Sequence, residues 1–324
     1  MKEIRYIWAI NEALKEEMER DENVVLIGED VGIPGGSFGA SRGLYDRFGP
    51  ERVFDTPISE AGIMGLAAGA AACGLRPIVE IMFMDFLTTC MDGIVNQIAK
   101  MRYMFGSQYA VPIVIRTPAG AGLNAGPQHS QSLEAWFAHV PGLKVIMPAT
   151  PYDVKGLLKS AIRDDNPVIF VENKALHTLK GPIPEEEYLV PIGKADVKKE
   201  GTDVTVVATS RMVHESLKAA EILSQKNIDI EVIDLLSISP WDKDAIFTSV
   251  SKTHRLVIAH EAVKSFGVGA EISATIAEEI IEELDSPVVR VGAPSVPIPF
   301  TPVLEKAYLP DTEDIISAIK KTLE

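Results

Sequence analysis

The sequence alternates short apolar runs with longer helical stretches, and this alternation constrains the fold more than any other feature. Apolar runs of strand length occur at residues 24–27, 77–81, 112–117, 143–147 and 168–172, and helical spacing occurs at residues 7–20, 85–103 and 151–163. Short apolar strands separated by helices are typical of a parallel sheet that is covered on both faces. The pattern therefore predicts an α/β fold with a doubly wound parallel sheet.

A change in composition divides the chain into two parts. Residues 174–193 contain three prolines and three consecutive glutamates without strong periodicity, which predicts a linker over the surface. Segments of strand and helix length resume after it. We predict an N-terminal domain over residues 1–184 and a smaller C-terminal α/β domain over residues 185–324.

Composition excludes several classes of function. The 324 residues carry a formal net charge of -15, so the surface should repel nucleic acid and anionic membranes. The two cysteines, Cys73 and Cys90, lie in apolar runs, which favours a reducing compartment without disulfides. The N-terminus lacks an apolar signal core, and no apolar run approaches the ~20 residues of a membrane span. We expect a cytoplasmic protein.

Glu60 begins a stretch in which almost every residue is Ala, Gly, Leu, Ile or Met. This composition predicts a helix that follows Ser59 as its N-cap, extends to about Gly74 and is buried all round. Glycines cost ~1 kcal/mol each inside a helix, so Gly65 and Gly69 indicate that another backbone packs close, as at a subunit interface. Because Glu is rarely buried without a partner, Glu60 is a catalytic candidate. A first-turn acid that favours the helix dipole is the alternative.

Two glycine-rich loops follow predicted strands, at the ends where open parallel sheets bind ligands. Residues 28–43 contain Glu29, and residues 118–130 contain His129 near their end. Neither the GxxxxGK[ST] pattern of a nucleotide loop nor a strand-GxGxxG-helix context is present in the second loop. The alternatives are a plain surface loop for the first segment and a capping histidine for the second.

Three motifs occur together: GEDV at residues 28–31, DTPISE at residues 55–60 and QHSQS at residues 128–132. In this order and spacing they resemble the beta subunit of thiamine-diphosphate-dependent 2-oxo acid dehydrogenases, and the resemblance covers essentially the whole chain. It implies a transketolase-like pyrimidine-binding domain over residues 1–184 and a transketolase-like C-terminal domain over residues 185–324.

The resemblance also implies site residues. Glu60 matches the glutamate that hydrogen-bonds the aminopyrimidine ring of thiamine diphosphate, and Glu29 matches an acid close to the cofactor. Phe86 matches the aromatic residue that packs on the aminopyrimidine, with a core aromatic as the alternative. His129 matches the histidine that faces the reacting carbon and helps transfer the acyl group to lipoamide. A structural monovalent cation such as potassium would be held by backbone carbonyls of Ile113, Ala161, Ile162, Asp164 and Asn166.

A missing motif indicates a partner chain. Thiamine enzymes hold magnesium and diphosphate with a GDG motif, and the sequence contains no GDG. By resemblance, an alpha subunit supplies the magnesium and diphosphate half, which implies an α2β2 heterotetramer that docks on a lipoyl acyltransferase core. The acidic run Glu278, Glu279, Glu282, Glu283 and Asp285 is a hypothetical docking face for a basic domain of that core; an ordinary solvated surface is the alternative.

The resemblance implies decarboxylation of a 2-oxo acid and reductive acylation of a lipoyl domain. Phe86 and Trp136 favour a pyruvate or acetoin-type substrate over a branched-chain one. A non-catalytic assembly scaffold of the same fold is the alternative from another class, and the joint presence of Glu60, Phe86 and His129 argues against it. Half of a transketolase-like enzyme is a third alternative.

Overall fold

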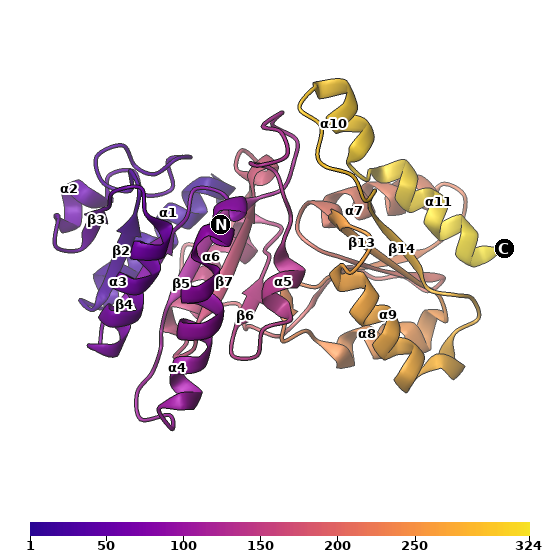
Figure 1. The fold of residues 1–324 in the computed structure, drawn as a ribbon. Helices are drawn as coiled ribbons and strands as arrows, with labels where there is room; N and C mark the ends of the chain where they lie inside the picture. The colour runs from indigo at the N-terminus through magenta and orange to yellow at the C-terminus, as the bar shows by residue number, and fades with distance from the viewer. The chain divides into compact units, whose positions relative to one another are not determined.

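The computed structural model describes residues 1–324 as two compact units (Figure 1). The first unit comprises Met1–Ala119 and Trp136–Ile192, and the second comprises Gly120–Ala135 and Gly193–Glu324. The second glycine-rich loop therefore groups with the C-terminal unit, although it lies in sequence between strands of the first.

The first unit is built on a parallel sheet, as the alternating pattern predicts. The strand order is β6-β7-β5-β4-β2-β3, and each pair of neighbours is parallel. The bounds are β2 (Val24–Gly28), β3 (Val53–Asp55), β4 (Arg76–Glu80), β5 (Val114–Ala119), β6 (Lys144–Ile146) and β7 (Val168–Asn173). A separate antiparallel pair joins β1 (Lys2–Arg5) to β8 (Lys180–Ile183). The five apolar runs are confirmed as strands, whereas the short strands β1, β3 and β8 were not predicted.

The helices of this unit are α1 (Tyr6–Arg20), α2 (Leu44–Phe48), α3 (Glu60–Ala72), α4 (Ala99–Met104) and α6 (Pro151–Arg163). Of these, α1 and α6 agree with the helices predicted from an amphipathic pattern. The short helix α5 (Glu134–Ala138) crosses the boundary between the two units. The helix predicted over residues 151–163 is confirmed at both ends, with Thr150 accepting a hydrogen bond from the backbone of Asp153 as its N-cap.

The single helix predicted over residues 85–103 is wrong. The chain instead forms a 3₁₀ segment (Met84–Cys90), a π segment (Gly93–Ile98) and then α4. The irregularity coincides with close packing, because a Cβ at Gly93 would lie 2.9 Å from the Cβ of Met64 in α3. Such π segments are rare, and they occur frequently at functional sites.

The prediction that α3 is buried all round is also wrong for this chain. Ile63, Met64 and Ala67 are buried, but Gly65 and Gly69 face open space, and a Cβ at either position would meet nothing within 4 Å. The small residues on this face therefore have no covering element within the chain. Ser59 occupies the N-cap position, but its side chain makes no capping hydrogen bond.

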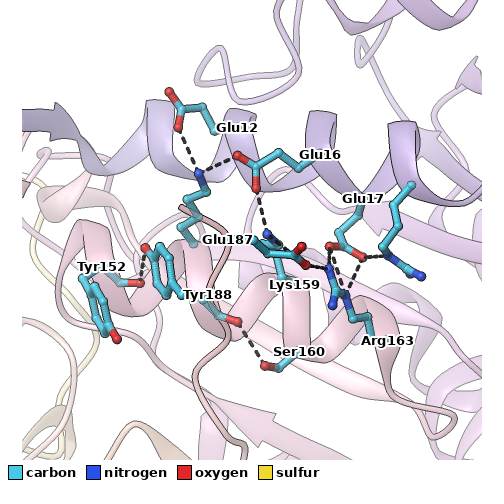
Figure 2. A network of polar contacts seen from close by, with 12 residues as sticks. Glu12, Glu16, Glu17, Tyr152, Lys159, Ser160, Arg163, Glu187 and Tyr188 are labelled. Atoms are coloured by element: carbon cyan, nitrogen blue, oxygen red, sulfur yellow. Dashed lines mark hydrogen bonds and ion pairs between the residues drawn. The ribbon is translucent and has the colours of Figure 1, made fainter. Parts of the chain in front are cut away.

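Ion pairs join α1 to α6 (Figure 2). Glu16 accepts hydrogen bonds from Lys155 and Lys159 at 2.6 and 2.8 Å, and both lysines are buried. Burial alone would raise the pKa of Glu16, but the hydrogen bonds from the two lysines lower it below its ordinary value. Glu17 is fully buried and accepts a 2.7 Å hydrogen bond from Arg163. The two helices are thus held by charges as well as by apolar contacts.

The predicted surface linker is more ordered than its composition indicates. Strand β8 lies within the predicted linker, residues 174–193. The residues after β8 pack on α6, and the ring of Tyr188 stacks on that of Tyr152 with 4.5 Å between the ring centres (Figure 2). The hydroxyl of Ser160 donates a 2.6 Å hydrogen bond to the carbonyl of Val190. A Cβ at Gly156 would lie 2.5 Å from a Val190 methyl group, so only glycine allows this approach.

The second unit is a second α/β domain, as predicted. Its sheet has the order β14-β13-β10-β11-β9, with only β9 antiparallel to its neighbour. The strands are β9 (Asp196–Lys199), β10 (Val204–Ala208), β11 (Ile230–Asp234), β12 (Ser237–Ser239), β13 (Leu256–Val263) and β14 (Val289–Ala293). The helices are α7 (Arg211–Ser224), α8 (Lys243–Thr253), α9 (Val268–Glu279), α10 (Pro302–Tyr308) and α11 (Thr312–Leu323).

None of the helices combines the length and the apolar character that crossing a bilayer requires.

We predict that Glu17→Ala destabilises the first unit by about 2–4 kcal/mol, because it leaves Arg163 and Arg20 without their buried carboxylate. Urea unfolding of the isolated chain measures this loss. Glu22→Ala is the matched control, since Glu22 is exposed just beyond the same helix, and it should change stability by less than about 0.5 kcal/mol. Equal effects of the two substitutions would contradict the ion-pair assignment.

Candidate active site

Glu29 lies directly after β2, where the order of the sheet reverses. Strand β2 lies between β3 and β4, so the chain continues from β2 to β3 on one side and then to β4 on the other side. In open parallel sheets this point, at the carboxyl ends of the strands, forms the ligand crevice. The loop after Glu29 is fixed by a hydrogen bond from the backbone N–H of Gly36 to the carbonyl of Asp30, at 2.8 Å.

Glu60 is brought to the same edge of the sheet from the next strand. Strand β3 ends at Asp55, and α3 begins at Glu60, which is half-buried. Of the apolar neighbours expected to enclose it, Ile63 and Met64 are buried but Ile58 is 83% exposed. The apolar enclosure expected around Glu60 is therefore incomplete within this chain.

The two carboxyl groups interact. Burial raises the pKa of Glu29 above its ordinary value, and the charges of Glu60 and Asp30 raise it further. Burial likewise raises the pKa of the Cys90 thiol to about 12, again with a contribution from Glu60. The negative charge of Glu60 therefore acts on both Glu29 and Cys90. Together with burial, it makes these two groups hold their protons more readily than they would in water.

Two polar atoms at the site are buried without a hydrogen-bond partner. They are Oε1 of Glu29 and the hydroxyl of Thr56, whose backbone N–H bonds the carbonyl of Gly28 at 3.0 Å. Buried polar groups normally have partners, and unpaired ones need an explanation. A ligand that donates hydrogen bonds, such as the amino group of an aminopyrimidine, fits this arrangement.

Phe86 follows β4 in the 3₁₀ segment and is half-buried. Its ring meets the edge of Phe83 at 5.5 Å, and Phe83 in turn meets Phe38 at 5.8 Å. The ammonium group of Lys174 lies 5.0 Å from the centre of the Phe83 ring. The aromatic candidate is thus part of a cluster that reaches the first glycine-rich loop through Phe38.

Sequence reasoning missed a buried ion triad beneath this cluster. Arg116 donates hydrogen bonds of 2.8 Å to Glu80 and to Glu172, and all three side chains are at most 4% exposed. The backbone N–H of Ser37 also bonds Glu80, which ties the loop to the triad. The signal in the sequence was a charged residue at a buried position in each of three largely apolar strands, Glu80 in β4, Arg116 in β5 and Glu172 in β7.

The predicted cation ligands lie around the turn that follows α6. Their carbonyls already accept hydrogen bonds: that of Ile113 from Val168, that of Ala161 from Asp164, and those of Ile162 and Asp164 from Arg76. The side chain of Asn166 accepts a 2.8 Å hydrogen bond from Arg102. A carbonyl oxygen has a second lone pair, so these bonds leave acceptor capacity for a cation.

His129 belongs to the second unit, whereas Glu29, Glu60 and Phe86 belong to the first. His129 is half-buried near the end of the second glycine-rich loop, and its backbone N–H bonds the carbonyl of Gly126 at 3.4 Å.

His260 lies inside β13 and has a structural environment. Burial lowers its pKa to about 4, and Nδ1 lies 3.1 Å from the carbonyl of Ala262. A Cβ at Gly267, Gly269 or Gly292 would come within 3.1 Å of the imidazole ring. Three glycines therefore make room for a neutral histidine.

Comparisons with known proteins cover both units. Residues 2–179 match the family described as transketolase, pyrimidine binding domain, and residues 193–315 match transketolase, C-terminal domain.

Three relatives from Bacillus subtilis (strain 168) match almost end to end. The acetoin:2,6-dichlorophenolindophenol oxidoreductase subunit beta is 50% identical, over 97% of this chain and 96% of that protein. The pyruvate dehydrogenase E1 component subunit beta is 46% identical and the 2-oxoisovalerate dehydrogenase subunit beta is 45% identical, each over 100% of both chains. Among solved structures, a split gene transketolase, described as an inactive beta4 tetramer, matches with a TM-score of 0.81 and 26% identity over 99% of this chain and 98% of that one.

We predict that Glu134, at the start of α5, makes stability depend on pH. It is buried, its Oε2 has no partner, and burial together with the charge of Glu261 raises its pKa from 4.5 to about 7. Because the folded state holds this proton more tightly than the unfolded state, the stabilisation is complete below pH 4.5. It is lost as the pH rises through 7, by about 3 kcal/mol.

Glu134→Gln should lack this loss. The free energy of unfolding of the variant, relative to that of the unsubstituted chain, should therefore rise by about 3 kcal/mol between pH 4.5 and 8. Urea unfolding across this range tests the prediction. His260 loses stability in the opposite sense, as the pH falls from 6.5 to about 4, but it does so in both proteins and cancels in the difference. A difference that does not vary with pH would refute the assignment.

Proposed function

Because the chain belongs to the family of transketolase-like beta subunits of 2-oxo acid dehydrogenases, we propose that it forms the pyrimidine-binding half of a decarboxylase active site. The observation that carries this proposal is the pair of interacting carboxyl groups, Glu29 and Glu60, at the reversal point of the sheet. Phe86 lies after the neighbouring strand.

Thiamine diphosphate, when bound, would accept the electron pair that is released as carbon dioxide leaves the 2-oxo acid. The chain's own contribution is to hold and activate it. We propose that Glu60 bonds the aminopyrimidine ring and shares a proton with it, and that the buried oxygen of Glu29 accepts a hydrogen bond from the same ligand. Phe86 would pack on the ring face.

The diphosphate half belongs, in this proposal, to a separate alpha subunit. The described chain contains no group of three or more His, Cys, Asp or Glu side chains that could hold a metal ion, and its sequence contains no GDG. The named relatives are beta subunits. We therefore propose an α2β2 heterotetramer in which magnesium is held mainly by the alpha chain. The open glycine face of α3 is consistent with a close partner.

A structural monovalent cation, such as potassium, is proposed at the turn after α6. The carbonyls of Ile113, Ala161, Ile162, Asp164 and Asn166 remain its proposed ligands. Support comes from Arg76, which donates hydrogen bonds to the carbonyls of both Ile162 and Asp164, so these two carbonyls converge on one cationic group.

We propose that the product acyl group passes to a lipoyl domain of an acyltransferase core, with His129 at the reacting carbon. Part of the negative charge on the hypothetical docking face is balanced by nearby basic side chains. Glu279 pairs with Lys243, Glu283 lies 3.8 Å from His254, and Asp285 lies 3.3 Å from Arg255. Helix α9 also ends at Glu279, so the run is not one helix face.

Pyruvate or an acetoin-type compound remains the favoured substrate, with a branched-chain 2-oxo acid as the alternative. The identities of 50%, 46% and 45% to the acetoin, pyruvate and 2-oxoisovalerate relatives are too close to separate them. Both cysteines are free, which supports the proposed cytoplasmic location.

One experiment tests the proposal directly. The chain is mixed with the alpha-type subunit from its source, thiamine diphosphate and magnesium, and a panel of 2-oxo acids is assayed with an artificial electron acceptor. Turnover that requires both chains supports the proposal, whereas no turnover with any substrate favours a non-catalytic scaffold. The description of the solved relative as an inactive beta4 tetramer gives that second candidate its support.

We predict that Glu60→Gln leaves the fold and assembly intact but slows exchange of the thiazolium C2 proton by roughly 10²- to 10⁴-fold, which corresponds to about 3–5 kcal/mol of barrier. A role at the helix dipole would instead change stability by only ~0.3–1 kcal/mol. Deuterium exchange in the reconstituted assembly, measured together with its melting temperature, separates the two. Near-normal exchange with a lowered melting temperature would make Glu60 structural.

We predict that His129→Ala lowers acyl transfer to lipoamide more than it lowers decarboxylation, because its proposed place is at the carbon that remains after carbon dioxide leaves. The two activities are compared with lipoyl domain and with an artificial acceptor in the same preparation. An equal loss in both assays would indicate a general structural role.

A further inference from the structure

The loop that carries His129 is buried at Ala121, which packs with Ala293, Ile298 and Tyr308. Within the second unit it borders a cavity of about 400 Å³. Loop residues Ala121, Pro127 and Ser130 line one side, and residues 261–263 and 295–298 line the other. The hydroxyl of Ser130 is buried without a partner. Because this cavity leaves part of the loop without apolar neighbours, apolar contacts alone do not determine the position of the loop.

Two buried carboxylates hold the loop instead. Glu261, in β13, accepts a 2.7 Å hydrogen bond from the backbone N–H of Ala121, and its second oxygen accepts one of 2.7 Å from Arg211. Glu305, in α10, accepts the backbone N–H of Asn124 with both oxygens, at 2.9 and 3.2 Å. The carboxylates are only 8% and 3% exposed.

The backbone of the loop is adapted to these bonds. Gly120, Gly122 and Gly126 have φ values of 87°, 103° and 77°, and Asn124 reaches 56°. Glycine adopts such conformations without steric cost and Asn tolerates them, so the sequence of the loop permits this backbone but leaves it free to adopt others. The bonds to Ala121 and Asn124 restrict this freedom, and charge-assisted bonds to carboxylates are stronger than neutral ones.

We propose that Glu261 and Glu305 are positioning residues that fix the His129 loop for acyl transfer. The inference rests on the proposed function, in which His129 acts at the reacting carbon. Both carboxylates act through the backbone of the loop: Glu261 accepts the N–H of Ala121 and Glu305 that of Asn124, and Glu261 also accepts a hydrogen bond from Arg211.

The two anchors should differ in their response to an amide. Ala121 and Arg211 donate to different oxygens of Glu261, and glutamine replaces one of these oxygens by an NH₂ group, so Glu261→Gln loses one of the two hydrogen bonds in the same side-chain conformation. Glu305→Gln keeps an acceptor for Asn124, because both oxygens of Glu305 serve the same N–H. Glu261→Gln should therefore be the more damaging substitution.

The first test measures the loop itself. Hydrogen exchange of the backbone amides of residues 120–126 is followed in the assembly reconstituted with the alpha-type subunit. Glu261→Gln should raise exchange at Ala121 about tenfold, Glu305→Gln should have a smaller effect at Asn124, and the exposed control Glu271→Gln should have none. Unchanged exchange in Glu261→Gln would overturn the proposal without bearing on decarboxylation.

The second test connects the loop to chemistry. Glu261→Gln should lower transfer to a lipoyl domain about tenfold while C2 proton exchange stays unchanged. In the double variant with His129→Ala it should cause little further loss, because the two residues act as one unit. Additive losses, or equal losses in transfer and C2 exchange, would overturn a positioning role. Failure of the proposed function itself would appear as absent decarboxylation in the unsubstituted assembly.

Discussion

The buried guanidinium of Arg116 supports the candidate site more directly than any other group. It joins Glu80 of β4 to Glu172 of β7 across β5, at the edge of the sheet where Glu29 and Phe86 lie. Removing one partner from a buried ion pair costs about 3–5 kcal/mol, since the remaining charge is left without compensation. The arrangement of the three strand ends therefore depends on all three charges being present.

The same triad reaches the ligand-facing loop. Ser37 bonds Glu80 through its backbone, and a Cβ at Gly36 would lie 2.6 Å from a Glu80 oxygen, so the loop lies directly over the carboxylate. Next to Ser37, Phe38 packs against Phe83 and against His177 at 5.0 Å. The hydrogen bond to Glu80 and the ring contacts of Phe38 thus hold the first glycine-rich loop.

Sequence reasoning predicted the strands and the amphipathic helices because burial imposes a period on them. It failed where the pattern had no single polar face: residues 85–103 are apolar on several sides, so nothing in the sequence revealed where the helix type changes. The face of α3 was misread for a related reason, because Gly65 and Gly69 indicate a close partner but not whether the same chain supplies it. Glu29 was selected because it lies in a glycine-rich loop directly after a strand and Glu60 because it begins an apolar helix, and both remain predicted site residues. The anchors of the His129 loop were not selected, since Glu261 and Glu305 lie 140 and 181 residues beyond the amides that they bind.

The order in the segment after β8 changes how a protease would meet this chain. Its composition, with exposed Glu185 and Glu186 between prolines, is that of a typical site of limited cleavage. Yet the stacked Tyr188 and the bonded Val190 fix one side, and the strand β8 fixes the other. A protease that needs an extended substrate must first detach these contacts, so cleavage would follow the free energy of local opening rather than surface exposure.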